Sequence, residues 1–249
     1  MKILVCISNV PDTTTKIKLS SDKKSVDMAG VQWVINPWDE LALTRAMELK
    51  EKSGGKIEKV TAITVGDKIC EPILRKALAV GADNAVRIDA VASDDYYVAA
   101  QIAEYVKKES FDMIFAGIES SDYNGSAVGS MLSEFLDIPS VSSVSNVDFE
   151  GDSFVMKRTV DGGSETVDTA LPMVAVVQKG IAIDPRIPAM RGIMMARKKP
   201  LSVEAPADIE ATTEFVEFEM PQPKPPVKMV DAENVAELFR LLHEEAKVL

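Results

Sequence analysis

The fold of this chain is indicated most clearly by residues 59–88, KVTAITVGDKICEPILRKALAVGADNAVRI. A buried strand is predicted over KVTAITVG, because apolar and β-branched residues dominate it. A helix carrying Ile73 and Leu74 follows and ends at Gly81, and a further strand is predicted over NAVRID. This order of strand, helix and strand predicts parallel strands joined by a crossover helix.

The same alternation continues through the first half of the chain. Short apolar strands are predicted over KILVCI at the start and over DMIFAG, which is apolar after its first residue. One helix is expected to begin with Asn36 as N-cap and Pro37 at its first position, and another with Ser93 as its cap. The sequence therefore predicts an α/β fold with a doubly wound, mostly parallel sheet.

The second half departs from this alternation. Hydrophobicity alternates with period two in SSVSNVDFEGDSFVMKRTVDGG, where Glu150-Gly151-Asp152 and Asp161-Gly162-Gly163 are predicted turns, so antiparallel structure is added at an edge. The four prolines of MPQPKPPVKMV predict an extended arm, and a final amphipathic helix follows with the stripe Val235, Leu238, Leu241 and Leu242. We expect a domain over residues 1–200 and an arm with its helix, packing on a partner subunit, over residues 201–249.

Charge and composition exclude several classes of function. The net charge of −11 repels nucleic acid and anionic lipid, so neither is an expected partner. Cys6 and Cys70 lie in apolar runs and provide no disulfide framework, which favours a cytoplasmic setting. Membrane insertion is not expected, because no apolar run has the length of a span. With His243 as the one histidine, we expect no metal site and no Ser-His-Asp apparatus, so chemistry must come from carboxylates or a cofactor.

A ligand is expected beyond the carboxyl ends of the predicted parallel strands. The most informative such segment is GIESSDYNGSAVGS, residues 117–130. Its glycines Gly117, Gly125 and Gly129 allow close backbone approach, and a helix starting near its end would direct free N–H groups at an anion. Two interpretations remain open from these residues, a phosphate cradle for a nucleotide and a plain loop with helix-capping serines.

Two further segments are equally ambiguous. In INPWDE, Asn36 and Pro37 suffice to start a helix, whereas Trp38 in the first turn could stack on an aromatic ligand. In DPRIPAMRGIMMARKKP, residues 184–200, prolines and a glycine forbid a long regular element, yet the segment is rich in isoleucine and methionine. It is either a buried connection or an apolar segment offered to another molecule.

The chain resembles the beta subunit of electron-transfer flavoproteins along almost its full length. The resemblance rests on KILVCISNVPD, on INPWDELALTRAMELKE, and on the block from VMKRTVDGG through LPMVAVVQKGIAIDPRIPAMRGIMMARKKP. This block matches the family signature in order and spacing at four places, namely R-x-x-D-G-G, L-P, P-R at 185–186 and I-M-x-A-x-K-K-P.

This resemblance implies a heterodimer with an alpha subunit that holds a redox-active FAD, while the beta subunit binds a structural AMP. It implies that the AMP-contacting positions are Cys6, Asn36, Pro37, Trp38, Asp39, Val65 and the loop positions Gly117, Ser120, Ser121, Asp122, Asn124, Gly125, Ser126, Ala127 and Val128. Ser8 and Asn9 stand where the family often has basic residues, and Val128 where it often has a hydroxyl residue.

The resemblance also implies that residues 184–200 dock on a partner flavin-dependent dehydrogenase. Met190 occupies the position of the family's anchoring leucine, and Ile193 is expected to contact the partner beside it. The basic residues Arg197, Lys198 and Lys199 are expected at the rim of that contact. The competing interpretation is that Met190 packs against its own domain.

Three functions follow as alternatives. The chain is expected to be an electron carrier rather than a catalyst with its own active-site residues, shuttling electrons from dehydrogenases through the FAD of the alpha subunit. The second alternative is an electron-bifurcating subunit that binds a second FAD and oxidises NADH. The third is a free-standing nucleotide-binding regulatory module, since fold alone does not define function.

Overall fold

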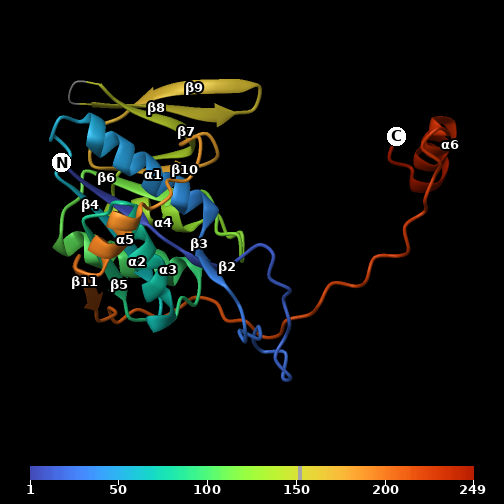
Figure 1. Ribbon diagram of the computed structural model, residues 1–249, viewed down its shortest axis with the longest axis horizontal. Coiled ribbons are helices and arrows are strands. Elements are labelled where there is room, and N and C mark those ends of the chain that lie inside the picture. Colours follow the sequence, from blue (N-terminus) through green and yellow to red (C-terminus); the bar gives the residue numbers. More distant parts are fainter. Residues whose placement is uncertain (151–152) are drawn as a thin grey trace.

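A nine-stranded sheet forms the centre of the computed structural model, which describes residues 1–150 and 153–249 (Figure 1). Its order is β11 (Leu201–Glu204), β5 (Asn84–Ile88), β4 (Lys59–Val65), β1 (Lys2–Cys6), β6 (Met113–Gly117), β10 (Met173–Val177), β7 (Ser140–Glu150), β8 (Ser153–Val160) and β9 (Gly163–Asp168). Neighbours from β11 to β7 are parallel, and β8 and β9 follow antiparallel. The predicted α/β, doubly wound and mostly parallel sheet with antiparallel additions is confirmed.

Helices cover both faces of this sheet. They are α1 (Pro37–Lys52), α2 (Glu71–Val80), α3 (Asp95–Lys108), α4 (Val128–Leu136) and α5 (Met190–Ala196). A 3₁₀ helix, η1 (Lys68–Cys70), precedes α2, whereas α6 (Val235–Arg240) and the π-helix η2 (Leu241–Ala246) lie away from the sheet (Figure 1). A separate antiparallel pair consists of β2 (Asn9–Pro11) and β3 (Trp33–Ile35). No helix in the described ranges is long and apolar enough to cross a bilayer.

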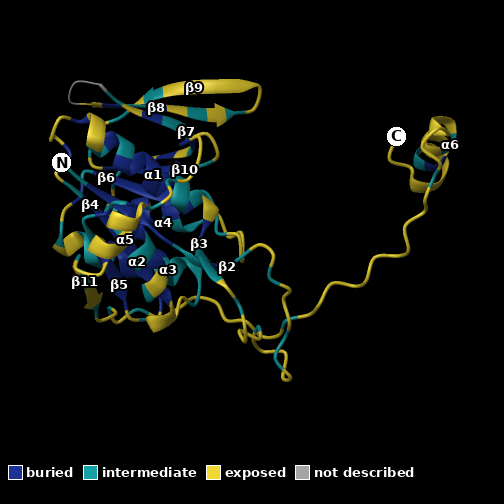
Figure 2. Ribbon diagram, in the orientation of Figure 1, coloured by how far each residue is buried: buried dark blue, intermediate teal, exposed yellow. Residues whose placement is uncertain are grey.

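The alternation of side chains along β1 explains why two layers of helices are needed. Ile3 and Val5 belong to one apolar cluster with α1 and α2, whereas Leu4 and Cys6 belong to a second cluster with α3 and α4. Both faces of the strand are therefore buried, as Figure 2 shows for the middle of the sheet. A parallel strand buried on both faces needs a continuous apolar run, which KILVC supplies.

The strand order reverses between β1 and β6. The chain passes from β1 to β4 and β5 on one side, and it then crosses to β6 on the other side of β1. The segments that leave β1 and β6 therefore diverge at their carboxyl ends. In open α/β sheets this divergence is where ligands bind.

One of the two predicted helix caps is wrong, and the other is confirmed in position but makes no side-chain cap. Asp94 rather than Ser93 caps α3, because its Oδ1 accepts a hydrogen bond from Tyr97 N at 2.7 Å, three residues along. Asn36 does occupy the N-cap position of α1, but its side chain makes no capping hydrogen bond. The predicted turn at residues 161–163 joins β8 and β9, whereas Gly151 and Asp152 of the other predicted turn lie outside the described residues.

The C-terminal region leaves the sheet later than expected. Leu201–Glu204 form edge strand β11, paired with β5, so the sheet extends past residue 200. Residues 220–230 form no regular structure, as predicted for the proline-rich arm. Figure 1 shows this arm leading away from the sheet to α6 and η2, which end at Ala246 and are shorter than the predicted final helix. Most of the arm and α6 is exposed (Figure 2).

Candidate functional site

Side chains at the start of α1 hydrogen-bond to both chain segments that leave β1 and β6. Asn36 Nδ2 donates to Glu119 O at 2.8 Å, and Asn36 Oδ1 accepts from Ser121 N at 3.2 Å. Asp39 Oδ2 accepts from Ser8 N at 2.7 Å, while Asp39 Oδ1 accepts from Gly117 N at 3.1 Å. Two side chains of one helical turn therefore hold both loops at the reversal of strand order.

Burial changes the acid–base properties of Asp39 and Cys6. Asp39 is 2% exposed, and desolvation raises the pKa of its carboxyl to about 7, against the lowering effect of the hydrogen bonds from Ser8, Asn36 and Gly117. Burial also raises the pKa of the Cys6 thiol, and the charge of Asp39 raises it further. Cys6 is therefore a neutral, unreactive thiol at neutral pH.

Gly117 is required by the close approach of α1. A Cβ atom added to Gly117 would collide with Asp39 Oδ1 and would lie 2.9 Å from the Cβ of Trp38. The half-buried Trp38 therefore lies directly beside the start of the 117–130 segment. Pro37, at the first helical position, is exposed.

The loop after Gly117 is exposed and contains unusual backbone. Asn124 and Ser126 have φ values of 52° and 55°, in the left-handed region that non-glycine residues seldom adopt. Ser121, Asp122 and Gly125 are exposed with them, and Ser120 and Ala127 are half-buried. The loop therefore combines an exposed surface with left-handed backbone at two non-glycine residues.

The loop ends at α4, whose N-terminus is uncapped. Ala127 precedes the helix and Val128 begins it, and no described side chain hydrogen-bonds to this end. The first N–H groups of a helix have no partner within the helix, and the helix dipole adds partial positive charge there. The second interpretation from the sequence, a loop with helix-capping serines, is thus not what the structure has.

The two outer glycines of the loop have different neighbours. A Cβ on Gly129 would lie 2.7 Å from Val176 Cγ2 and 3.2 Å from Ala116 Cβ, so this glycine lets α4 pack closely on β6 and β10. A Cβ on Gly125 would collide with the carboxylate of Asp95 at the start of α3. Gly125 therefore faces an acidic side chain, and the region suited to an anion lies at the α4 end.

Two predicted site residues have buried side chains. Cys6 and Val65 end β1 and β4, and both side chains are buried in the apolar cluster beneath α3 and α4. At these positions only the backbone at the strand end is available for a contact. Their place at the carboxyl edge is nevertheless the one expected from the sequence.

The segment 184–200 is anchored on one side and exposed on the other. Gly192 faces Ala79 O of α2 so closely that a Cβ would collide with it, and Arg75 Nη1 donates to Ala196 O at 2.9 Å. Met190 at the start of α5 is 76% exposed, so it is not part of this chain's core. Ile193 is also exposed on α5.

The three basic residues after α5 do not form one exposed cluster. Arg197 and Lys198 are exposed. Lys199 instead donates from Nζ to the carbonyl oxygens of Leu78 at 3.1 Å, Gly81 at 3.0 Å and Ala82 at 2.6 Å, at the C-terminal end of α2. The expectation that Lys199 lies at a docking rim is wrong, because its ammonium group hydrogen-bonds to carbonyl oxygens that the helix end leaves without partners.

Comparisons with known proteins identify the family of this chain. The model of the electron transfer flavoprotein domain matches residues 24–209. The chain is 36% identical to the electron transfer flavoprotein subunit beta of Bacillus subtilis, with all of both chains covered. It belongs to the electron-transfer flavoprotein beta-subunit family. It is also 35% identical to the Syntrophomonas wolfei subunit beta, over 90% of this chain and 87% of that protein, and 30% identical to the human one, over 100% and 99%.

One buried charge at the carboxyl edge was not identified from the sequence. Arg87 of β5 is 4% exposed, and its Nη1 donates to Gly66 O at 2.9 Å and to Asp89. Its Nε and the Oδ1 of Asn9 are buried without a hydrogen-bond partner among the described residues. The signal was a single charged residue inside the apolar strand NAVRI.

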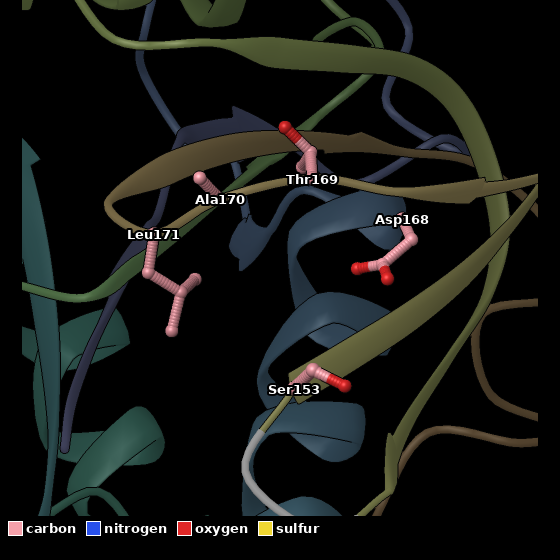
Figure 3. A pocket seen from close by; sticks show the side chains of 5 residues that line it. All are labelled: Ser153, Asp168, Thr169, Ala170 and Leu171. Carbon is pink, nitrogen blue, oxygen red and sulfur yellow. The ribbon is translucent and has the colours of Figure 1, made fainter.

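Two surface hollows lie at the opposite edge of the sheet. One is lined by Ser153, Asp168, Thr169, Ala170 and Leu171, and Asp168 is the one charged side chain among these described residues (Figure 3). The other is lined by residues at the starts of β4 and β5, including Lys59 and Asn84. Neither includes a predicted nucleotide-binding residue. Within the described ranges, no group of three or more His, Cys, Asp or Glu side chains is arranged to hold a metal ion.

Proposed function

We propose that this chain is the beta subunit of a heterodimeric electron-transfer flavoprotein that binds AMP at the carboxyl edge of its sheet. The observation that carries the proposal is the junction of Asn36 and Asp39, which holds the loops after β1 and β6 beside the uncapped N-terminus of α4. A nucleotide phosphate at this end would receive backbone N–H groups and a favourable helix dipole.

The residues present fit an AMP molecule in this role. The backbone of Ser126 to Val128 offers N–H donors, and the left-handed Asn124 and Ser126 curve the loop as anion-binding backbone does. Trp38 lies at the first turn of α1 and supplies an aromatic face for the base. The buried Asp39 does not contact the phosphate in this proposal and acts by holding Ser8 and Gly117 in position.

Electron transfer itself requires FAD, which we assign mainly to the alpha subunit. When bound, the flavin accepts electrons from a dehydrogenase and passes them on. This chain then supplies nucleotide anchoring and docking surfaces, in agreement with the relatives that are named subunit beta. It contributes no catalytic residue of its own in this proposal.

Two exposed apolar surfaces supply the expected contacts with partners. The segment with Met190 and Ile193, flanked by Arg197 and Lys198, is proposed to dock on a flavin-dependent dehydrogenase. The arm and helix of residues 220–249 are proposed to pack on the alpha subunit, because this part of the chain leads away from the sheet (Figure 1) and most of its apolar side chains are exposed. Deletion of residues 220–249 should then abolish co-elution with the alpha subunit on a sizing column.

Nucleotide stoichiometry in the purified heterodimer tests the proposal. The bound molecules are released with acid and quantified by chromatography, and one AMP and one FAD per heterodimer are expected. Two FAD and no AMP would replace the proposal with the bifurcating alternative. A chain that purifies with a different nucleotide and without an alpha subunit would favour the regulatory alternative.

A pair of asparagine variants tests the junction itself. Asn36→Ala removes both side-chain hydrogen bonds to the 117–130 segment without removing a helix cap, so AMP content should fall while the secondary structure is retained. Asn146→Ala is the matched control, because Asn146 lies on β7, where it contacts Asp148. Equal AMP content in both variants would contradict the assignment of this junction to the nucleotide site.

A further inference from the structure

The chain between β11 and the free arm is fastened along the carboxyl edge of the sheet. Gln101 Nε2 of α3 donates to Ala207 O at 2.9 Å, and Ala207 N donates to Gln101 Oε1 at 2.8 Å. Farther along, Phe218 N donates to Lys23 O at 2.8 Å. Residues 207–218 therefore follow a fixed path over this edge before the arm becomes free.

Asp94 is the firmest attachment of this segment. Its Oδ2 accepts hydrogen bonds from the backbone N and the hydroxyl of both Thr212 and Thr213, at 2.7 to 3.2 Å, while its Oδ1 caps α3. Partial burial acts to raise the pKa of Asp94, but hydrogen bonds from Tyr97, Thr213 and Thr212 outweigh it and lower the pKa to about 2. The carboxylate therefore keeps these bonds throughout the neutral pH range.

Between these attachments, three aromatic rings form a stack that reaches the proposed nucleotide loop. Phe215 stacks on Tyr123 with ring centroids 5.1 Å apart at 28°, and on Phe218 with centroids 5.1 Å apart at 27°. Tyr123 is 56% exposed and Phe215 is 54% exposed. Each ring thus covers part of its neighbour on an otherwise solvent-facing surface.

The loop is held at both ends, and near its tip Gly125 lies against the carboxylate of Asp95. Asn36 holds its beginning at Glu119 and Ser121, and α4 fixes its end at Val128. The ring of Tyr123 packs outside the loop on Phe215. The strained backbone at Asn124 and Ser126 follows directly, and such conformations persist where surrounding contacts hold them.

We propose that residues 212–218 form a strap that fixes the conformation of the nucleotide-binding loop, with Tyr123, Phe215 and Phe218 as its positioning residues. The inference rests on the proposed nucleotide function of residues 117–130. It adds that the C-terminal region of this same chain determines how tightly the loop is held. None of the three rings is assigned a contact with the nucleotide.

Hydrogen exchange of the full-length chain, without added nucleotide, tests the strap directly. Phe215→Ala removes the middle ring and with it both stacks, so exchange of the amides of residues 118–127 should accelerate about twofold to tenfold. Val216→Ala is the matched control, because Val216 is 76% exposed and lies in the same segment. Unchanged loop exchange in Phe215→Ala, with the control also unchanged, overturns the proposal.

Two variants of Tyr123 separate the ring from its hydroxyl. Tyr123→Phe keeps the stack and should leave loop exchange as in the parent chain, whereas Tyr123→Ala should reproduce Phe215→Ala. Acceleration in both Tyr123 variants would overturn the stacking argument. The two variants change the same position and differ in whether an aromatic ring is kept. A difference between their loop exchange rates is therefore due to the ring.

The consequence for the nucleotide is measured separately, with the native heterodimer and a fluorescent AMP analogue. Phe215→Ala should raise the dissociation rate of the analogue by a factor similar to the change in loop exchange. Faster loop exchange with an unchanged dissociation rate overturns the role in nucleotide positioning. If the parent heterodimer binds no AMP analogue, the proposed function fails, while hydrogen exchange still decides whether the strap holds the loop.

Discussion

Replacing Asp39 by asparagine is expected to change how the stability of this chain depends on pH. Asp39 is almost fully buried, and the pKa of its carboxyl is raised from 3.8 to about 7, first by desolvation. In an unfolded chain an aspartate titrates near about 3.9. The folded chain therefore binds this proton more tightly than the unfolded chain does.

The sign of the effect follows from this difference in proton affinity. Between about pH 4 and about pH 7 the folded state holds more protons at Asp39 than the unfolded state, so the free energy of unfolding falls as the pH rises. The stabilising contribution is complete below about pH 4 and is lost above about pH 7. The pKa difference corresponds to about 4 kcal/mol in total, of which about 3 kcal/mol falls between about pH 5 and about pH 8.

Urea unfolding of the parent chain and of Asp39→Asn across this pH range measures the effect. Asparagine has no proton to lose, so the unfolding free energy of the parent minus that of the variant should fall by about 3 kcal/mol from about pH 5 to about pH 8. Asp112→Asn is a useful control, because Asp112 Oδ2 also accepts a backbone hydrogen bond, from Lys2 N at 2.7 Å. Parallel pH profiles for the parent and Asp39→Asn would refute the argument, and carbon NMR of the Asp39 carboxyl should show a midpoint near about 7.

Three other substitutions have contrasting expected effects. Gly129→Ala should lower the free energy of unfolding by about 1–3 kcal/mol in a denaturant titration, because its Cβ would overlap Val176, whereas Gly163→Ala should have little effect because nothing lies within 4 Å of its added Cβ. Lys199→Ala should lower the melting temperature, because it removes three hydrogen bonds to the end of α2, whereas Lys198→Ala should not. Equal melting temperatures of the two variants would contradict a stabilising role of Lys199 at this helix end. Met190→Ala should weaken the complex with the cognate dehydrogenase about tenfold to hundredfold, which is measured as a higher apparent KM, while AMP content and melting temperature stay unchanged. A lower melting temperature with normal dehydrogenase coupling would show that Met190 packs within the chain.

The central sheet could be predicted because its signals are local. In β1, the apolar run KILVC is enough to indicate a strand buried on both faces, and the helices that follow have their own start and stop residues. Edge strand β11 could not be predicted in this way. Its four residues, LSVE, are largely exposed and become a strand through pairing with β5, more than a hundred residues earlier in the chain.

The site shows the same division between local and distant information. Capping preference correctly placed Asn36 at the start of α1, but it assigned the side chain to the helix, whereas Glu119 O and Ser121 N compete for it from distant sequence. The pairing of Tyr123 with Phe215 joins two loops, and an aromatic residue in a loop carries no information about its partner. Arg87 was not singled out from the sequence, and a charge inside a strand does not by itself say that it will meet the carbonyl of Gly66.

The position of β10 has a consequence for the order in which this chain acquires its structure during synthesis. β10 is made after β7, β8 and β9, yet it lies between β6 and β7 and pairs with both. Until the ribosome has released Met173–Val177, the β7–β8–β9 ribbon has no strand through which to join the sheet, and β6 presents an open apolar edge. We therefore expect a nascent chain that stops before β10 to need a chaperone, and the last third of the protein to be what converts two separate β segments into one sheet.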